Sequence, residues 1–419
     1  MVNFMKSIFD ETVDISSNLI KINSVNPSFE GPGEEEKTKY IKNKLEEYVK
    51  KYGIDNFQIL NYNIKDENNI LRPNIVSKFN FSKDKTLTII SHTDVVPIGD
   101  IGLWDTDPFE PIISDNVIYG RGCEDNHKGI VSSFLLLKMI FEEQIDPKYN
   151  LNLIFVSDEE NGSKYGLSYL VDNFEKELFN KDDLIIVPDF GVFDGNLIEI
   201  AEKKIMWIKF KIKGKQCHGS TPENGLNADV LAFKFGEGLY CKLYKKYNNI
   251  NSIFTPPFST FEPTMLKNNV ENTNTIPGYV ELNFDCRILP EYDINDVLAD
   301  IDEYIKLFKN EFEKYLFHYD LKEKDNLEIT YDILKIETST PTKPESKIVT
   351  KLESAIKTVL KKEPKVCGMG GGTVAAFLRE KGYPVAVWGI GYETAHQPNE
   401  HIKVEQLIDM AKVYLDIMK

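Results

Sequence analysis

An apolar, β-branched run of the chain, Thr86-Leu87-Thr88-Ile89-Ile90-Ser91-His92-Thr93-Asp94, ends in a histidine and, two residues later, a carboxylate. Such a run predicts a buried parallel strand of an α/β domain. Because ligands of open α/β sheets bind at the carboxyl ends of strands, we expect His92 and Asp94 to lie at a functional site. A metal-bound histidine commonly donates its other ring N–H to a carboxylate, a role that suits Asp94. A capped strand end with two solvated polar residues is the plainer alternative.

Length and composition predict a soluble protein with more than one domain. The chain has 419 residues, which exceeds what one hydrophobic core usually organises. Its hydrophobic content of 42% is a globular value, and no apolar run approaches the roughly 20 residues that span a bilayer. The opening residues lack the basic flank and long apolar stretch of an export signal, so we expect a cytoplasmic location.

Charge argues against two classes of binding partner, and cysteine content argues against disulfides and a thiolate metal site. The formal net charge of −16 argues against nucleic-acid phosphates and anionic membranes. The five cysteines are an odd number without a Cys-x-x-Cys pair, which predicts reduced thiols rather than a disulfide frame or a thiolate zinc site.

Three consecutive acids, Asp158, Glu159 and Glu160, follow the predicted strand Leu151–Ser157. Carboxylates crowded at the end of a buried strand repel one another unless cations neutralise them or the loop is solvated. A metal ion is the simpler explanation, since these acids occupy the same strand-end position as His92.

Two further predicted strands also lead to potential ligands. Asp189 follows the first strand, Leu184–Pro188, and a glycine turn links the second, Pro384–Trp388, to His396. Another glycine-flanked turn delivers Asp125 near a helix start, where an isolated Asp would more often be an N-cap. Histidines and carboxylates without thiolates form an N/O site that suits zinc, with manganese or cobalt as alternatives.

Strand-end ligands stop between residues 204 and 336, where strands and helices alternate in the pattern of an α+β domain. We therefore expect two domains: residues 1–203 with 337–419, and an insert of residues 204–336. Elements of the insert are predicted at Ile205–Ile212, Ala228–Lys245, Phe258–Leu266, Tyr279–Ile288, Ile294–Phe312 and Leu327–Lys335. Outside it, further strands are predicted at Asn56–Asn61 and Asn74–Phe79, and helices at Ser7–Ile22, Gly33–Lys51, Ile130–Phe141, Val374–Glu380 and Val404–Met418.

Taken together, the motifs resemble the co-catalytic metallohydrolase family of aminoacylase, acetylornithine deacetylase, succinyl-diaminopimelate desuccinylase and glutamate carboxypeptidase. The resemblance covers nearly the whole chain. It rests on Ser91-His92-Thr93-Asp94-Val95-Val96-Pro97, Gly120-Arg121-Gly122-x-x-Asp125, Asp158-Glu159-Glu160, Asp189, Gly214-x-x-x-His218, Asn274-x-Ile276-Pro277 with Asp285-x-Arg287, and His396-x-x-Asn399-Glu400. It implies a catalytic domain with a mixed sheet flanked by helices, of the zinc-peptidase type, and an inserted ferredoxin-like dimerisation domain.

The resemblance also implies roles for the candidate ligands. His92 and Asp189 are expected to bind one metal ion, Glu160 and His396 the other, and Asp125 to bridge the two. Glu159 is expected to be the general base, and Asp94 belongs with the catalytic residues. Two zinc ions per chain are therefore expected.

In the insert, the resemblance implies a homodimer in which His218 reaches the partner's active site and helps hold the tetrahedral oxyanion. Arg287 is expected to grip a substrate carboxylate, because its planar fork pairs bidentately. Asn274 is counted as a further substrate contact, and Gly371, Gly372 and Thr373 as an anion cradle at a helix start. From the residues alone, each of these also has a merely structural reading.

One departure concerns the residues after Asp125. The resembled family usually has one residue before the following lysine, whereas Asn126 and His127 precede Lys128 here. We expect His127 to be an exposed residue at a helix start rather than an additional ligand.

The sequence thus predicts a metal-dependent amidohydrolase that cleaves an N-acyl amino acid, similar to acetylornithine deacetylase or succinyl-diaminopimelate desuccinylase. A metallo-dipeptidase or carboxypeptidase is the alternative within the class. A non-catalytic protein that binds a small ligand on the same scaffold is the alternative outside it, and the intact Glu159 argues against that reading.

Overall fold

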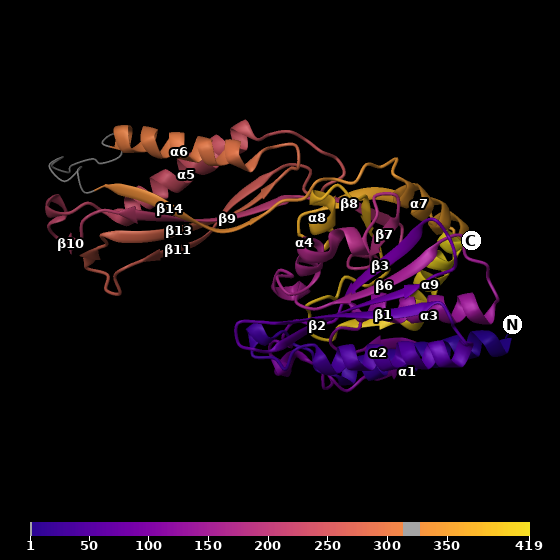
Figure 1. Ribbon diagram of the computed structural model, residues 1–419. Coiled ribbons are helices and arrows are strands. Elements are labelled where there is room, and N and C mark those ends of the chain that lie inside the picture. The colour runs from indigo at the N-terminus through magenta and orange to yellow at the C-terminus, as the bar shows by residue number, and fades with distance from the viewer. Residues whose placement is uncertain (1, 313–326) are drawn as a thin grey trace. The chain divides into compact units, whose positions relative to one another are not determined.

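The computed structural model describes residues 2–312 and 327–419, and the chain divides into two compact units (Figure 1). Unit 1 comprises Met1–Ile200, Thr342–Cys367 and Thr373–Lys419. Unit 2 comprises Ala201–Pro341 and Gly368–Gly372, so it is an insertion in the sequence of unit 1.

Within the described residues, eight strands form a mixed sheet in the order β1-β2-β6-β3-β7-β16-β8-β15. These strands are β1 (Phe57–Lys65), β2 (Leu71–Phe79), β3 (Thr86–His92), β6 (Asn150–Val156), β7 (Leu184–Val187), β8 (Leu197–Glu202), β15 (Lys365–Met369) and β16 (Val385–Val387). A smaller sheet pairs β17 (His401–Lys403), β5 (Val117–Tyr119) and β4 (Ile112–Ser114) in that order.

Strand β3 lies at the centre of the parallel part of the large sheet. It is parallel to both β6 and β7, and β7 is parallel to β16. Ile89 pairs with Leu153 on one side and with Ile186 on the other. Because parallel strands end at the same edge of a sheet, the loops that follow β3, β6, β7 and β16 are brought together there.

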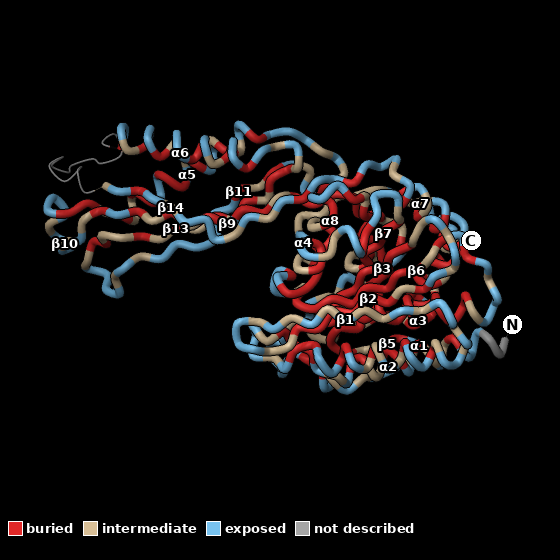
Figure 2. The backbone as a smooth tube through the Cα atoms, in the orientation of Figure 1, coloured by how far each residue is buried: buried red, intermediate tan, exposed pale blue. Residues whose placement is uncertain are grey.

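Helices cover the large sheet. They are α1 (Val2–Lys21), α2 (Glu35–Tyr52), α3 (His127–Glu142), α4 (Leu167–Leu178), α7 (Lys347–Val359), α8 (Ala375–Glu380) and α9 (Val404–Met418). Every residue of α3 from His127 to Ile140 is buried, and α3 packs against α1, α9 and β3. The strands β3, β6, β7 and β16 are buried along nearly their whole length, which places the core of unit 1 between the helices and this part of the sheet (Figure 2).

Unit 2 has a βαββαβ order: β9 (Lys204–Lys213), α5 (Ala228–Lys246), β11 (Thr260–Asn268), β13 (Tyr279–Ile288), α6 (Ile294–Glu311) and β14 (Glu328–Glu337). The four strands form an antiparallel sheet in the order β11-β13-β9-β14, the arrangement of a ferredoxin-like domain. Helices α5 and α6 lie along one face, where Phe210, Phe235 and Phe284 belong to a shared core (Figure 1). A short pair, β10 (Cys217–His218) with β12 (Thr275–Ile276), also lies in this unit.

The predicted fold class is confirmed, since a large mixed sheet flanked by helices carries an inserted α+β unit. The predicted strand Tyr279–Ile288 and helix Val404–Met418 are observed with the predicted bounds, and the other predicted elements differ by a few residues at their ends. Helices α4 and α7 were not predicted. No helix within residues 2–312 and 327–419 is long and apolar enough to cross a membrane.

Candidate metal centre

The candidate ligands of unit 1 meet at the carboxyl edge of the parallel strands. His92 is the last residue of β3, and Asp189 comes two residues after β7. Glu159 and Glu160 begin a 3₁₀ turn that starts three residues after β6. The turn before α3 supplies Asp125, whose backbone N–H is held by Glu400. Strand direction therefore explains why residues so far apart in the sequence share one site.

His92 forms the first group of contacts. Its Nε2 lies 2.8 Å from Oδ1 of Asp125 and 3.2 Å from Oδ1 of Asp189. Its Nδ1 lies 3.0 Å from the backbone oxygen of Asp94, which can only accept a hydrogen bond. That carbonyl oxygen is nearer than the carboxylate of Asp94, at 3.5 Å, so it is the group that orients the ring and leaves Nε2 to face the two carboxylates.

His396 forms the second group. Its Nε2 lies 3.1 Å from Oδ2 of Asp125 and 3.1 Å from Oε2 of Glu160. Asp125 thus presents one oxygen to each histidine, the arrangement required of a carboxylate that bridges two cations. Possible ligand atoms of His92, Asp125 and Glu160 lie within 4.8 Å of one another, and the same is true of His92, Glu159 and Asp189.

The pKa values of these groups show an excess of buried negative charge. Burial and, after it, the nearby Asp125 raise the pKa of Glu160 to about 7. Burial and the neighbouring Asp189 likewise raise the pKa of Glu159 well above its usual value. Hydrogen bonds to Asp125 and Glu160 raise the pKa of His396 to about 10. Protons are held tightly where a cation would relieve the same repulsion.

Glu160 supplies a test of whether a metal ion fits. Its Oε2 faces His396, whereas Oε1 is buried and finds no hydrogen-bond partner among the described residues. A buried carboxylate oxygen without a partner is costly unless another group binds it. Together with the imidazole and carboxylate donors, this oxygen fits a divalent cation that accepts N and O ligands.

Asp94 has a second task that the sequence did not reveal. Its Oδ1 accepts the backbone N–H of Glu159 and its Oδ2 that of Glu160, each at 3.1 Å. Asn26 donates from Nδ2 to both Asp94 and Asp158, at 3.0 Å each. The side chain of Asp94 therefore fixes the backbone from which Glu159 and Glu160 project.

A buried ion network supports the same turn from behind. Arg72 donates two hydrogen bonds to Glu34, at 2.6 and 3.0 Å, and one to Asp158 at 3.0 Å. Asp158 has a left-handed backbone, with φ of 65°, and its Oδ2 accepts the N–H of Tyr165. Asn26, Arg72 and Glu34 were not predicted as site residues, because none of them lies at a strand end that carries a ligand.

The residues after Asp125 correct one prediction. His127 is only 1% exposed, so the expectation of an exposed histidine was wrong. Its Nε2 lies 2.6 Å from Nζ of Lys37, which is equally buried on α2. Asn126 donates from Nδ2 to Oδ1 of Asp189 at 2.7 Å, and Lys128 is buried at the start of α3. Asn126 and His127 thus both make contacts inside the protein, and Asn126 contacts a candidate ligand.

The predicted residues of unit 2 have the following local contacts. His218 is exposed, its Nδ1 lies 2.8 Å from Oγ of Ser220, and the next residue, Gly219, donates its N–H to the backbone oxygen of Asn274. Arg287 donates from Nε and Nη2 to the carboxylate of Asp285, at 2.7 and 3.0 Å, and from Nη1 to the oxygen of Gly370. The fork of Arg287 is therefore already directed at an acid within its own strand.

The segment predicted as an anion cradle is divided between the two units. Gly371 and Gly372 belong to unit 2 and Thr373 to unit 1. Oγ1 of Thr373 accepts the N–H of Ala375 at 3.2 Å, at the first residue of the six-residue helix α8. This hydroxyl therefore lies at a helix start, one residue before the N-cap Val374.

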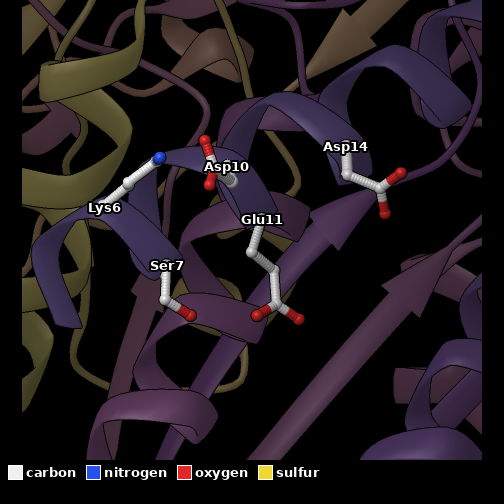
Figure 3. Close-up of a pocket in the computed structure, with 5 residues that line it drawn as sticks. All are labelled: Lys6, Ser7, Asp10, Glu11 and Asp14. Carbon is white, nitrogen blue, oxygen red and sulfur yellow. The ribbon is translucent and has the colours of Figure 1, made fainter. Parts of the chain in front are cut away.

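A hollow of about 510 Å³ lies elsewhere on unit 1, along α1 (Figure 3). Its lining residues are Lys6, Ser7, Asp10, Glu11 and Asp14, none of which belongs to the candidate site. Glu11 is bound by Tyr48 and Lys138, so this acid serves the packing of α1 against its neighbours.

Residues 88–419 match the model of peptidase family M20/M25/M40, and this segment contains all of the candidate ligands. The chain belongs to this family. As a member it is a metal-dependent hydrolase, and the recognition of the metallohydrolase family from sequence is confirmed.

Individual proteins agree with this assignment. An uncharacterized metallohydrolase of Methanococcus maripaludis is 70% identical over 415 residues, which are 99% of this chain and 100% of that one. A succinyl-diaminopimelate desuccinylase of Nitratiruptor is 26% identical and aligns over 98% of this chain and 99% of its own. The crystal structure of a metallo-carboxypeptidase of the M20 family from Sulfolobus solfataricus matches 97% of this chain and 98% of its own, with a TM-score of 0.72 at 19% identity. The last match concerns the fold alone.

Proposed function

We propose that the protein is an amidohydrolase with two divalent metal ions, which cleaves the amide bond of an N-acyl amino acid. The observation that carries the proposal is the position of Asp125, which presents one carboxylate oxygen to His92 and the other to His396. A carboxylate that presents one oxygen to each of two imidazole groups can bridge two cations. The two pairs around it, Asp189 with His92 and Glu160 with His396, complete two N/O ligand sets.

The metal ions are proposed to be zinc, held by His92, Asp125, Glu160, Asp189 and His396. The donor set has no thiolate and suits zinc, with cobalt or manganese as substitutes. The chemistry that divalent ions supply at such a site is Lewis acidity, which lowers the pKa of water and polarises a carbonyl group.

Glu159 is proposed as the general base. It takes the proton from the attacking water and delivers it to the leaving amine nitrogen. For this task its carboxylate must stay free of the metal ions while that of Glu160 binds one. Asp94 supports the division of labour, because it holds the backbone N–H groups of both glutamates and so fixes where each side chain starts.

The raised pKa of Glu159 suits such a shuttle. A base with an ordinary carboxyl pKa gives up the captured proton readily but accepts it poorly at neutral pH. Burial and Asp189 hold the pKa of Glu159 well above that value in the metal-free protein. Nearby cations will lower this pKa again, so that it lies between the ordinary carboxyl value and the raised value of the metal-free protein.

Two similarities support the choice of substrate class. The resemblance of the sequence motifs to deacylases and the 26% identity to a protein named a desuccinylase favour an N-acyl amino acid. Arg287 is proposed to hold the substrate carboxylate after exchanging its contact with Asp285. A carboxypeptidase or dipeptidase activity is the second candidate, because the Sulfolobus solfataricus protein that shares this fold is named a carboxypeptidase.

A homodimer formed through unit 2 is part of the proposal. A groove of about 310 Å³ runs between α5 and the edge strand β11, and three large apolar residues there are exposed: Phe233 at 58%, Met265 at 58% and Leu266 at 40%. Exposed apolar side chains beside an unpaired strand edge favour association with a second copy. We also place the protein in the cytoplasm, a choice that its five free cysteines support.

The test is a hydrolysis screen of the full chain with zinc, cobalt or manganese, using N-acetyl and N-succinyl amino acids and dipeptides. Release of a free amine from an N-acyl amino acid, abolished by chelation and by Glu159→Gln, is the expected result. Turnover of dipeptides alone would favour the second candidate. Stoichiometric metal binding without turnover of any substrate would support the non-catalytic reading instead.

A further inference from the structure

Two buried glutamates join the loop that carries Asp125 to the loop that carries His396. Glu124 is 2% exposed and Glu400 is fully buried. Glu124 belongs to the turn that follows β5, whereas Glu400 comes directly before β17, and these two strands are paired. Each glutamate binds backbone groups of the opposite loop, so the contacts are reciprocal.

Glu400 holds the loop of Asp125. Its Oε1 accepts the backbone N–H groups of Glu124 and Asp125, at 2.9 and 3.0 Å. Its Oε2 accepts the N–H of Gly122 at 2.9 Å and a guanidinium hydrogen bond from Arg121 at 2.7 Å. A carboxylate with four donors fixes this turn without touching the side chain of Asp125.

Glu124 holds the loop of His396 in the same way. Its Oε1 accepts the N–H of Glu393 at 2.8 Å, and its Oε2 accepts both the N–H and the hydroxyl of Thr394, at 2.7 and 2.5 Å. Its carboxylate also packs on Gly391, where an added Cβ would meet Oε1 at 2.2 Å. Gly391 is therefore the position that gives Glu124 room to reach the loop.

The loop of His396 needs such support. Glu393, His396 and Asn399 all have left-handed backbones, with φ of 64°, 63° and 57°. Residues other than glycine rarely adopt this conformation, and they keep it only where surrounding contacts impose it. The side chain of His396 is 55% exposed, so packing around the imidazole does little to place it. Its position follows mainly from its backbone.

We propose that Glu124 and Glu400 are positioning residues that set the loops of Asp125 and His396 in the register required for two metal ions. This inference rests on the proposed metal centre. The roles differ: Glu124 acts on the loop of His396, which belongs to one ion, whereas Glu400 acts on the turn of Asp125, which is shared by both. The two glutamates therefore have different effects on the two metal affinities.

The experiment is a calorimetric titration of the metal-stripped full chain with zinc, for wild type, Glu124→Gln and Glu400→Gln. A glutamine replaces one acceptor oxygen with a donor that faces a backbone N–H, so the hydrogen bonds to that oxygen are lost and the loop is held less firmly. In Glu124→Gln we expect one zinc site of wild-type affinity and one weakened by roughly 10- to 100-fold, the usual effect of losing an outer-sphere partner. In Glu400→Gln both sites weaken.

Glu199→Gln is the matched control. Glu199 is a fully buried glutamate of unit 1 that pairs with Arg379 and contacts neither loop. This variant loses thermal stability but is expected to keep both zinc affinities, which separates positioning from a general loss of stability. Thr394→Val removes the hydroxyl that donates to Glu124 and also accepts the N–H of His401, but it leaves the backbone donors to Glu124 in place. It is expected to weaken the same single site to a smaller extent.

The possible outcomes separate the inference from the function on which it rests. Wild-type protein that binds fewer than two zinc ions would overturn the metal centre and the inference together. Two wild-type sites with unchanged affinities in Glu124→Gln and Thr394→Val would overturn the inference alone. Equal weakening of both sites in Glu124→Gln and in Glu199→Gln would assign Glu124 a structural role only.

Discussion

Oδ1 of Asp94, at the end of β3, accepts the backbone N–H of Glu159, at the end of β6, across a distance of 3.1 Å. The hydrogen bond ties together two strand ends that are parallel neighbours in the sheet. The companion bond from Glu160 to Oδ2 has the same length. A carboxylate that accepts a hydrogen bond on each oxygen holds the backbone of its partners more firmly than one that accepts on a single oxygen.

Replacement of Asp94 with Asn should therefore impair catalysis without removing a ligand. The amide offers one oxygen where two are used, so either Glu159 or Glu160 loses its backbone acceptor. We expect kcat to fall roughly 10- to 100-fold, measured on the substrate found by the screen. Asp183→Asn is the matched control, because Asp183 accepts the N–H of Thr86 at the opposite end of β3. Equal kcat in wild type and Asp94→Asn would remove this support role.

Glu159 and Glu160 are neighbours with different proposed roles, and their amide variants should differ accordingly. Glu159→Gln is expected to keep the fold and two metal ions but to lower kcat roughly 100-fold or more, the scale of a general acid–base contribution. Glu160→Gln is expected to lose one metal ion first. Elemental analysis after dialysis, together with kcat at saturating zinc, separates the two. Near-normal kcat in Glu159→Gln would exclude this residue as the base.

The strand ends explain how much of this site could be predicted from sequence. β3, β6 and β7 are rich in apolar residues, and polar residues stand at the end of each strand or within two residues after it. Both the strands and the clustering of His92, Glu160 and Asp189 therefore follow from pattern and topology. Apolar periodicity also marks the elements of unit 2. Helix α7 went unpredicted although its buried residues Ile348, Val349, Leu352, Ala355 and Ile356 follow helical spacing.

Buried polar residues were the harder part. Charged side chains are expected at the surface, and Lys37 stands in a strongly charged stretch, yet it is 1% exposed and bound to His127. One signal existed: Lys37 lies one helical turn before Ile41, on the same face as the buried Leu45 and Tyr48. No comparable pattern marks Glu124 or Arg72, because their partners are distant in sequence and are defined only by the folded loops.

Asp125 is the proposed bridge, and its loss should affect both metal ions. In Asp125→Ala neither His92 nor His396 keeps its shared carboxylate, so both zinc affinities should fall together. Elemental analysis over a series of free zinc concentrations measures this. Asp189→Ala is the informative comparison, since Asp189 lies beside His92 and not beside His396, so its loss should loosen one ion more than the other. Retention of two ions at wild-type affinity in Asp125→Ala would exclude bridging.

Zinc binding should become stronger as the pH rises. In the metal-free protein the pKa of His396 is raised to about 10 and that of Glu160 to about 7, so both hold protons at pH 6. Zinc binds only the unprotonated forms and must displace these protons. Above pH 7 Glu160 has lost its proton and only His396 still releases one. For this site we expect about two protons released per zinc at pH 6 and about one at pH 8.

Calorimetry in two buffers with different ionisation enthalpies counts those protons. At zinc concentrations that fill the weakened site, Glu160→Gln provides the control at pH 6, because the amide has no proton to lose and the count should fall by about one. A zinc affinity that is constant between pH 6 and pH 8, with no proton release, would contradict the assignment of His396 and Glu160 as ligands.

The last prediction concerns the dimer and His218. All proposed ligands and Glu159 lie in unit 1, whereas His218 lies exposed in unit 2. If His218 serves the partner's active site, His218→Ala and Glu159→Gln each give a nearly inactive homodimer. In a mixed dimer, two-fold symmetry places both substitutions at one active site and leaves the other complete. Mixing the two inactive proteins should therefore restore about half of the wild-type activity per heterodimer.

Mixing His218→Ala with wild type provides the reference for subunit exchange, which mass measurement of differently tagged chains can follow. Exchange without recovery would mean that His218 acts within its own subunit or has no catalytic role, and a fully active monomer would exclude any need for the dimer.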